Sequence, residues 1–465
     1  MSYETLLKWF DLKVLVEFVN NIMWNKNLLV ILLVGSGLYL TIRTRFIQLR
    51  LFGRILKILK NESKQSKDGI SSLESLFLGT ACRVGAGNIA GVVAAVSVGG
   101  PGSLFWMWLM AILGSATAFV ESVLAVKYHV RNEDGQMTGG TPWIIKDRLG
   151  LKSLGAIFVV SSIVCYLGVI QVMSNTITDS ITSAYVSTSP KMISIIIASI
   201  VGIILLMKGK KDVIIESLNK IVPLMAILYL VVVLYILIIN ITSMPSVFLN
   251  IFYQAFGGKE FLGGTIGATI IHGVKRGLFS NEAGSGNSTY ASAVVATDNG
   301  VEQGFVQILG VFVDTLIICS ATAFVILLGD TSSIGKVSEM ALFQTALSNH
   351  IGKIGVIFSI VILFFFCLST ILGVAYYGRN ALNYISGKSY LKTVYSILVI
   401  FMVYIGGIEQ NLFVWSLADF GLGIMTLINL LCILPLSGEV IKILKDYEAK
   451  LPIFKKKIKA ENGKI

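Results

Sequence analysis

Long apolar stretches, separated by short polar and basic loops, run along almost the whole chain. A helix crosses the hydrocarbon core of a bilayer with about 20 apolar residues, and about eleven stretches meet that criterion. They lie roughly at residues 27–43, 75–98, 102–126, 154–186, 191–207, 213–242, 261–296, 303–329, 351–386, 391–407 and 411–436. This pattern predicts an all-α integral membrane protein with about eleven transmembrane helices.

Two of these stretches are interrupted by glycine and polar residues. The segment Gly79–Gly91 contains Arg83 and Asn88, and the segment Gly277–Thr289 contains Glu282 at its centre. Each glycine costs about 1 kcal/mol in a helix interior relative to alanine, and an arginine at mid-membrane costs at least about 2.5 kcal/mol. Irregular backbone at this depth is tolerated only where it lines a cavity or is buried in protein. Both segments are therefore predicted to be breaks in transmembrane helices.

A broken helix exposes the backbone groups that bind charged ligands. A half-helix beginning near Gly87 presents free N–H groups and the positive end of its dipole to a carboxylate. A half-helix ending near Val84 presents free carbonyl groups to a cation. The geometry favours a zwitterion together with a small cation, as in secondary transporters. The alternative is that the glycines only allow close helix packing, which leaves the added Arg, Asn and Glu unexplained.

Charged side chains at the breaks form a possible charge network. Unpaired, Arg83 and Glu282 would each be costly in the membrane, so we expect them to pair or to share a polar network. The alternative is that each faces a water-filled vestibule. Lys275 and Arg276 precede the second break, and the acids available to pair with them are Glu121, Asp314 and Asp419.

The composition and charge distribution agree with a membrane protein and predict its orientation. The chain is 55% hydrophobic and only 14% charged, with a net charge of +12. Of its 38 Lys and Arg residues, 28 lie in one set of alternating loops and the C-terminal tail, and 7 lie in the opposite set. The positive-inside rule then places the N-terminus outside and the C-terminus in the cytoplasm of a multi-pass plasma-membrane protein. We expect the tail lysines Lys455–Lys457 and Lys459 to act as a positive-inside anchor, and the sequence has no basic stripe suited to nucleic acid.

The remaining polar residues argue against an enzyme or a channel. The cysteines lie in apolar runs without CxxC spacing and the three histidines are far apart, so neither a metal cluster nor a disulfide framework is expected. No nucleophile–base set is evident. A channel predicts a repeated pore loop or a ring of like charges, and the sequence has neither.

The spacing of the two breaks suggests an inverted repeat. If the first span is set aside, the breaks fall in the first and sixth helices of a ten-helix core, the 5+5 arrangement of LeuT-type transporters. The expected divisions are 1–70 (extracellular segment, extra helix and basic cytoplasmic loop), 71–242 (first five-helix repeat), 243–436 (second five-helix repeat) and 437–465 (Lys-rich cytoplasmic tail).

Nearly the whole chain resembles one family, the alanine or glycine:cation symporters, also called sodium:alanine symporters. Three pairs of stretches carry the resemblance, in order along the chain. They are Arg83–Gly91 with Gly99–Trp108, Arg276–Gly284 with Gly310–Thr315, and Leu368–Gly373 with Tyr376–Gly378. The resemblance implies a LeuT-type fold and sodium-driven uptake of a small neutral amino acid, with Na⁺ as the coupling ion and no covalent cofactor.

The resemblance also implies roles for particular residues. The sodium ligands would be the carbonyls of Ala81, Val84 and Phe366 and the hydroxyls of Ser369 and Thr370. The substrate carboxylate would be held by backbone N–H groups of the first break, which comprises Gly85, Ala86, Gly87 and Asn88. Carbonyls near Phe279, Ser280 and Asn281 in the second break would receive the ammonium group. Asn88 would serve a second cation position or brace the break.

Several positions depart from the family pattern, in which Thr is usual at Ala86, Gln near Met173, Trp at Val374 and Glu at Arg379. Val374 lies one turn beyond Thr370 and is expected to face the substrate, so the loss of a Trp there would enlarge the side-chain space. We therefore expect a substrate whose side chain is larger or more polar than that of alanine. A proton-coupled amino-acid transporter on the same fold is the alternative, although the two hydroxyls favour sodium.

Overall fold

The computed structural model describes residues 12–61, 69–133, 135–207, 212–258, 266–329, 334, 339–408 and 413–451. Within these ranges the protein is almost entirely helical, and a single two-stranded antiparallel hairpin joins β1 (Val130–Arg131) to β2 (Met137–Thr138). The predicted all-α fold class is confirmed. The tail lysines of the predicted anchor lie outside the described residues.

The helices fall into three groups along the chain. Those that precede the first break are α2 (Leu12–Asn20), η1 (Asn21–Asn25), α3 (Leu28–Arg43), α4 (Ile47–Arg50) and α5 (Phe52–Asn61). The next group is α6 (Ser72–Arg83), η2 (Gly87–Gly91), α7 (Val92–Gly99), α8 (Ser103–Lys127), α9 (Thr141–Leu149), α10 (Lys152–Ala184), α11 (Pro190–Leu206) and α12 (Val213–Ile239). The last is α13 (Met244–Ala255), α14 (Ile266–Asn281), α15 (Asn287–Ala293), α16 (Gly300–Val311), η3 (Phe312–Cys319), α17 (Ser320–Leu327), α18 (Glu339–Ile351), α19 (Ile354–Ile385), α20 (Ser389–Ile408) and α21 (Phe413–Ala449).

Many of these helices have the length and composition of membrane spans. In the described ranges seven are long and apolar enough to cross a bilayer, and counting each bent helix pair as one span brings the number to nine. The apolar helix α11 is shorter, and the α14–α15 pair is interrupted by polar residues. The predicted count of eleven therefore stays a prediction. Helix α21 runs through residue 436, where the second repeat was expected to end.

Both predicted breaks are present. Helix α6 begins at a capping box, in which the Ser71 side chain accepts from the Glu74 N–H group and the Glu74 side chain accepts from the Ser71 N–H group. It ends at Arg83, and the chain resumes with η2 and α7 after a bend of 57°. The second break separates α14 from α15 and contains Glu282, whose φ of 56° lies in the left-handed region. Such a conformation is costly for a residue with a side chain and marks a strained position.

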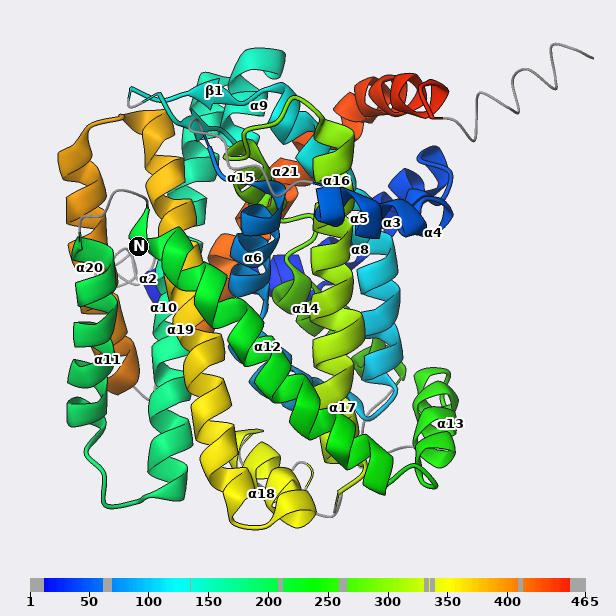
Figure 1. The fold of residues 1–465 in the computed structure, drawn as a ribbon, viewed down its shortest axis with the longest axis vertical. Helices are drawn as coiled ribbons and strands as arrows, with labels where there is room; N and C mark the ends of the chain where they lie inside the picture. Colours follow the sequence, from blue (N-terminus) through cyan, green and yellow to red (C-terminus); the bar gives the residue numbers. More distant parts are fainter. Residues whose placement is uncertain are drawn as a thin grey trace, which may run out of the picture.

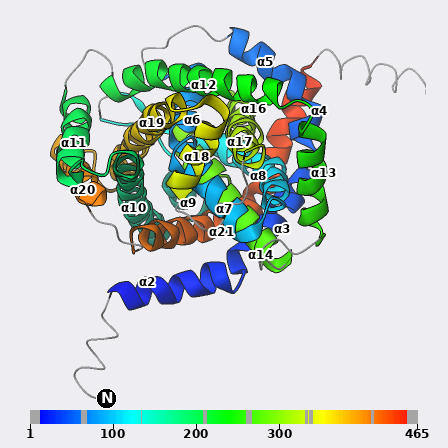
Figure 2. The same cartoon turned by 90° about the horizontal axis from the view of Figure 1, so that it is seen from below.

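The broken helices lie inside a ring of longer ones. Seen from below, α6 and α7 are surrounded by α8, α10, α12, α19 and α21 (Figure 2), and the second broken pair contacts the first, α14 against η2 and α15 against α6. Helix α10 packs against both α19 and α21, and α11 pairs with α20 at one side of the molecule (Figure 1). The outer helices expose many large apolar side chains, such as Ile203, Ile227 and Phe401, which suits contact with lipid. This arrangement buries the two breaks side by side at the centre.

Candidate substrate and cation site

The end of α6 and the middle of α19 form a cluster of oxygen atoms. The Thr370 hydroxyl lies 2.9 Å from the Ala81 carbonyl oxygen, 3.1 Å from that of Phe366 and 3.3 Å from that of Val84. The neighbouring Ser369 hydroxyl donates to the Phe366 carbonyl at 2.9 Å. All five residues named for sodium by the family resemblance thus meet at one place.

The chemistry of this cluster fits a hard cation. A hydroxyl has one proton to donate, so Thr370 cannot satisfy three carbonyl oxygens at once. The carbonyls of Ala81 and Val84 are available because the helix ends there and leaves its last carbonyls without intrahelical partners. Oxygen ligands without imidazole or thiolate suit a hard cation. We name these five residues, Ala81, Val84, Phe366, Ser369 and Thr370, the oxygen cluster.

The backbone amides of the first break lie directly beside the oxygen cluster. The Gly85 N–H donates to the Asn88 side-chain oxygen at 2.9 Å, and the Ala86 N–H contacts the Met173 sulfur at 3.3 Å. A thioether is a weak acceptor, so the Ala86 amide is only weakly satisfied. Gly87 lines the adjacent cavity and packs near the Phe279 ring. The Ala86 amide can therefore take a stronger acceptor such as a carboxylate.

A small cavity lies between the two breaks, and we call it the central cavity. Its volume is about 20 Å³, little more than the space one water needs. Its lining residues come from both breaks and from α10, α19 and α21. They are Cys82, Arg83, Gly87, Cys165, Tyr166, Val169, Met173, Phe279, Glu282, Asn287, Thr370 and Leu422. In this conformation the central cavity is therefore too small to hold an amino acid.

Arg83 connects the first break to the second. Its Nε donates to the Asn281 carbonyl at 2.9 Å, and its Nη2 donates to the Ser288 hydroxyl at 3.1 Å and to the Gln307 side-chain oxygen at 2.8 Å. No direct ion pair joins Arg83 to Glu282 within the described residues, where Arg83 Nη1 and Glu282 Oε2 are both buried without a hydrogen-bond partner. The two charges instead share the wall of the central cavity.

Two buried acidic side chains, Asp314 and Glu121, accept hydrogen bonds from residues of the two breaks. The Asp314 carboxylate accepts from Asn88 Nδ2 at 2.7 Å and from the Ser280 hydroxyl at 2.8 Å. Asp314 belongs to the π-helix η3, a distortion often found at functional sites. The Glu121 carboxylate accepts from the Gly286 N–H at 3.2 Å and from the Asn429 side chain at 2.6 Å. Asn88 thus braces the first break by contacting both its Gly85 amide and Asp314.

Aromatic and charged side chains of α14 and α21 lie close to Phe279, which lines the central cavity. Lys275 and Asp419 form an ion pair, with Nζ 2.6 Å from Oδ2. The Arg276 guanidinium lies 5.1 Å from the centre of the Trp415 ring, which stacks near Phe279 at 5.4 Å. Of the three acids considered for Lys275, the structure selects Asp419.

The Lys275–Asp419 pair provides a first test of the fold. We expect Lys275→Met and Asp419→Asn each to lower the thermal unfolding midpoint, because each leaves a half-buried charge without its partner. The double variant should be more stable than the sum of the single losses predicts, with a coupling of about 0.5–3 kcal/mol. Thermal unfolding of the purified protein measures all three. The exposed pair Lys13–Glu17, at 4.0 Å, is the matched control and should show almost no coupling; additive losses at Lys275 and Asp419 would contradict the pairing.

Several contacts at this site could not be foreseen from the sequence. The Tyr166 hydroxyl donates to the Asn287 side-chain oxygen at 2.7 Å in the wall of the central cavity. The polar composition of the second break indicated that Asn287 could belong to a site. Tyr166 could not be identified in this way, because it is the one tyrosine in the apolar helix α10. Val374 is buried and is not among the residues lining the closed cavity.

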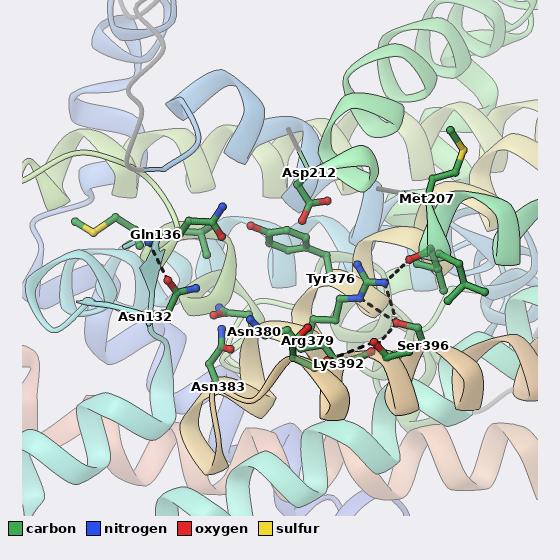
Figure 3. A pocket seen from close by; sticks show the side chains of 16 residues that line it. Asn132, Gln136, Met207, Asp212, Tyr376, Arg379, Asn380, Asn383, Lys392 and Ser396 are labelled. Carbon is green, nitrogen blue, oxygen red and sulfur yellow. Dashed lines mark hydrogen bonds between the residues drawn. The ribbon is translucent and has the colours of Figure 1, made fainter. Parts of the chain in front are cut away.

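A second and much larger cavity lies at the ends of α11, α12, α19 and α20, and we call it the wide cavity. Its volume is about 430 Å³. Figure 3 shows Asp212, Tyr376, Arg379 and Lys392 among its lining side chains. The β1–β2 hairpin contributes further residues, and His129 beside it lies 3.3 Å from the Ala293 carbonyl. Burial lowers the pKa of His129, so at neutral pH this contact is made by an uncharged imidazole.

The fold and the site define a membrane transporter of the LeuT type. The structure is similar to a solved structure described as MhsT in complex with L-phenylalanine, with a TM-score of 0.51, 16% identity, and coverage of 79% of this chain and 89% of that one. At this identity the likeness establishes the fold alone. The chain belongs to the sodium:alanine symporter family, whose sequence model matches residues 10–461.

Three curated relatives illustrate the range of this family. The chain is 37% identical to the probable sodium/glutamine symporter GlnT of Bacillus subtilis, over 97% of this chain and 95% of that protein. It is 39% identical to the amino-acid carrier protein AlsT of the same organism, with 92% and 91% covered. It is 33% identical to the sodium/alanine symporter AgcS of Methanococcus maripaludis, with 94% and 97% covered.

Proposed function

We propose that this protein is a sodium-coupled symporter that takes up a neutral amino acid across the plasma membrane. The oxygen cluster is the observation that carries the proposal. Three carbonyl oxygens converge on the Thr370 hydroxyl beside the first break, where the Ala86 amide is only weakly satisfied by the Met173 sulfur. A cation bound there would lie next to a carboxylate held by those amides, so that each ligand favours the binding of the other.

The roles of the substrate-binding residues follow from their positions. The carboxylate would displace the Met173 sulfur from the Ala86 N–H and contact the amides of Gly85 to Asn88. The ammonium group would face the second break near Phe279, Ser280 and Asn281, with the unpartnered Glu282 Oε2 available to it. The two half-helices would have to separate to admit the substrate, since the central cavity has a volume of only about 20 Å³.

We expect a substrate with a polar side chain, such as glutamine, to be preferred over alanine. The wall of the central cavity carries Arg83, Glu282 and Asn287, and a carboxamide can donate to and accept from such groups. The family also includes the relative described as a probable sodium/glutamine symporter. Competition of unlabelled amino acids against radiolabelled L-glutamine uptake in proteoliposomes measures the preference. Glycine and alanine outcompeting all larger amino acids would contradict it.

Sodium dependence is tested by ion replacement. Proteoliposomes should take up the amino acid when an inward Na⁺ gradient is imposed, and should fail when K⁺ or choline replaces Na⁺. The rival function is proton coupling, which the buried acids Glu121, Glu282 and Asp314 make worth testing. Uptake driven by a pH gradient without Na⁺ would favour the rival.

The orientation is part of the proposal. The uneven distribution of Lys and Arg places the N-terminus outside and the C-terminus in the cytoplasm. All five native cysteines are buried, so single cysteines introduced at Thr188 and at Lys450 can report on the two faces. An impermeant maleimide added to intact cells should label the first and spare the second.

A further inference from the structure

The wide cavity is a separate site from the central one, because no residue lines both. Its volume of about 430 Å³ is within the range of roughly 300–1,000 Å³ that small-molecule pockets occupy. The loops around it belong to the Lys- and Arg-rich set that is predicted to face the cytoplasm. We propose that this cavity binds a free amino acid as a zwitterion on the release side of the membrane, independently of sodium. The inference rests on the proposed function for the identity of its ligand.

Arg379 is held ready to bind a carboxylate. Its Nη2 donates to the Leu205 carbonyl at 2.6 Å and to the Ser396 hydroxyl at 2.8 Å, and its Nε donates to the same hydroxyl at 3.2 Å. These contacts, drawn as dashed lines in Figure 3, fix the plane of the guanidinium. Its Nη1 has no hydrogen-bond partner among the residues that the structure describes. A fixed guanidinium with a free edge loses little entropy when it takes up a carboxylate.

Asp212 supplies the opposite charge without forming a direct ion pair with Arg379 in the described part of the chain. Its carboxylate caps the start of α12 by accepting from the Ile214 N–H at 2.9 Å. Within the described part of the chain, no ion pair of 4.0 Å or less joins Asp212 to Arg379. Two opposite charges that line one cavity, each held by other contacts, leave a gap that a molecule carrying both charges can bridge.

The remaining polar lining favours a zwitterion over a phosphate. Asn132, Gln136, Asn380 and Asn383 place carboxamides around the cavity, and each such group can both donate and accept. The Asn383 side-chain oxygen is buried without a partner, so it offers an acceptor to an ammonium or amide group. The Asp212 carboxylate and these acceptor oxygens suit the ammonium end of a zwitterion, a donor group that a phosphate does not have, while Arg379 and Lys392 supply the cationic side of the cavity.

In the described wall of the cavity, the Leu205 carbonyl and the Ser396 hydroxyl meet at the Arg379 guanidinium, so a side-chain cation already takes up the oxygen atoms that come together there. Binding there should therefore need no sodium, unlike binding at the central cavity. An amino acid that has accumulated in the cytoplasm would occupy the wide cavity whether or not the inner sodium concentration is low. This difference in ion dependence allows the two sites to be measured separately.

Equilibrium dialysis of radiolabelled L-glutamine against the purified full-length protein in nanodiscs tests the proposal. In choline buffer we expect one bound equivalent, and in Na⁺ buffer a second one. Arg379→Gln and Asp212→Asn should each weaken the sodium-independent component by about ten-fold or more and spare the sodium-dependent one. Asparagine still caps a helix, so the Asp212 variant tests charge and not folding. Arg148→Gln, which removes an exposed arginine outside the cavity, is the matched control and should leave both components unchanged.

The outcomes separate this inference from the proposed function. A sodium-dependent component alone, with normal uptake, would overturn the wide-cavity site and leave symport intact. A sodium-independent component that Arg379→Gln does not change would also overturn it. The sodium-independent component alone, with no uptake in any ion gradient, would support the site and contradict symport. Glutamine methyl ester and N-acetylglutamine should both compete poorly with glutamine; full competition by either would show that the ligand is not recognised as a zwitterion.

Discussion

Thr370→Val should strongly weaken the sodium dependence of amino-acid uptake while leaving the protein folded. Valine has nearly the shape of threonine, but it removes the one hydroxyl on which the carbonyls of Ala81, Val84 and Phe366 converge. A cation at this place would lose a ligand, and the carbonyls would lose their donor. We expect the sodium concentration for half-maximal uptake to rise by about ten-fold or more, which corresponds to at least about 1.4 kcal/mol.

A matched substitution isolates the cation effect from the loss of a buried hydroxyl. Thr426 is also fully buried, and its hydroxyl donates only within its own helix, to the Leu422 carbonyl at 2.7 Å. Thr426→Val should therefore transport with nearly unchanged sodium dependence. Uptake titrated with Na⁺, together with the thermal unfolding midpoint of each variant, makes the comparison. Equal sodium dependence in the two variants would place the cation elsewhere.

Gly85→Ala should block both ligands by filling the space between them. A methyl group on Gly85 would come within 2.3 Å of the Thr370 hydroxyl and 3.1 Å of the Met173 sulfur. Because real side chains do not approach so closely, Thr370 or the backbone of the first break would have to move. We expect uptake and glutamine binding in Na⁺ buffer both to be lost at the central site, with retained expression in the membrane.

Gly35→Ala is the control for Gly85→Ala. Gly35 lies in α3 with no atom within 4 Å of the position that a methyl group would take. The change should keep full uptake and raise helix stability by roughly 0.5–1 kcal/mol. Uptake by Gly85→Ala at the level of this control would mean that the first break does not shape the site.

The breaks could be predicted because they place charged and polar residues inside stretches that are otherwise apolar enough to cross a membrane. Arg83, Asn88 and Glu282 lie in apolar surroundings where a regular helix would leave them unsatisfied, so the sequence itself marks them. Short helices outside the apolar stretches, such as α13 and α18, gave no comparable signal. The π-helix η3 could not be predicted either, because Asp314 and its neighbours have the residue pattern of an ordinary helix.

The five residues of the oxygen cluster could be named only through the family resemblance; the structure brings them together, and their role as sodium ligands stays a prediction. Side-chain partners were harder to predict. Direct pairing of Arg83 with Glu282 was one expectation, yet Arg83 turns to Asn281, Ser288 and Gln307. The direction of a side chain at a break depends on backbone angles such as the positive φ of Glu282, which residue types alone do not specify.

The contact between Met173 and the Ala86 amide has a consequence for the energetics of the first break. An amide left bare in a dry interior would be costly, and one bonded to a strong acceptor would be slow to release it. The Met173 sulfur, 3.3 Å from the Ala86 nitrogen, is a weak acceptor and so avoids both costs. If the proposed carboxylate site is correct, we expect the carboxylate to replace this sulfur at little energetic cost, because only a weak hydrogen bond is lost.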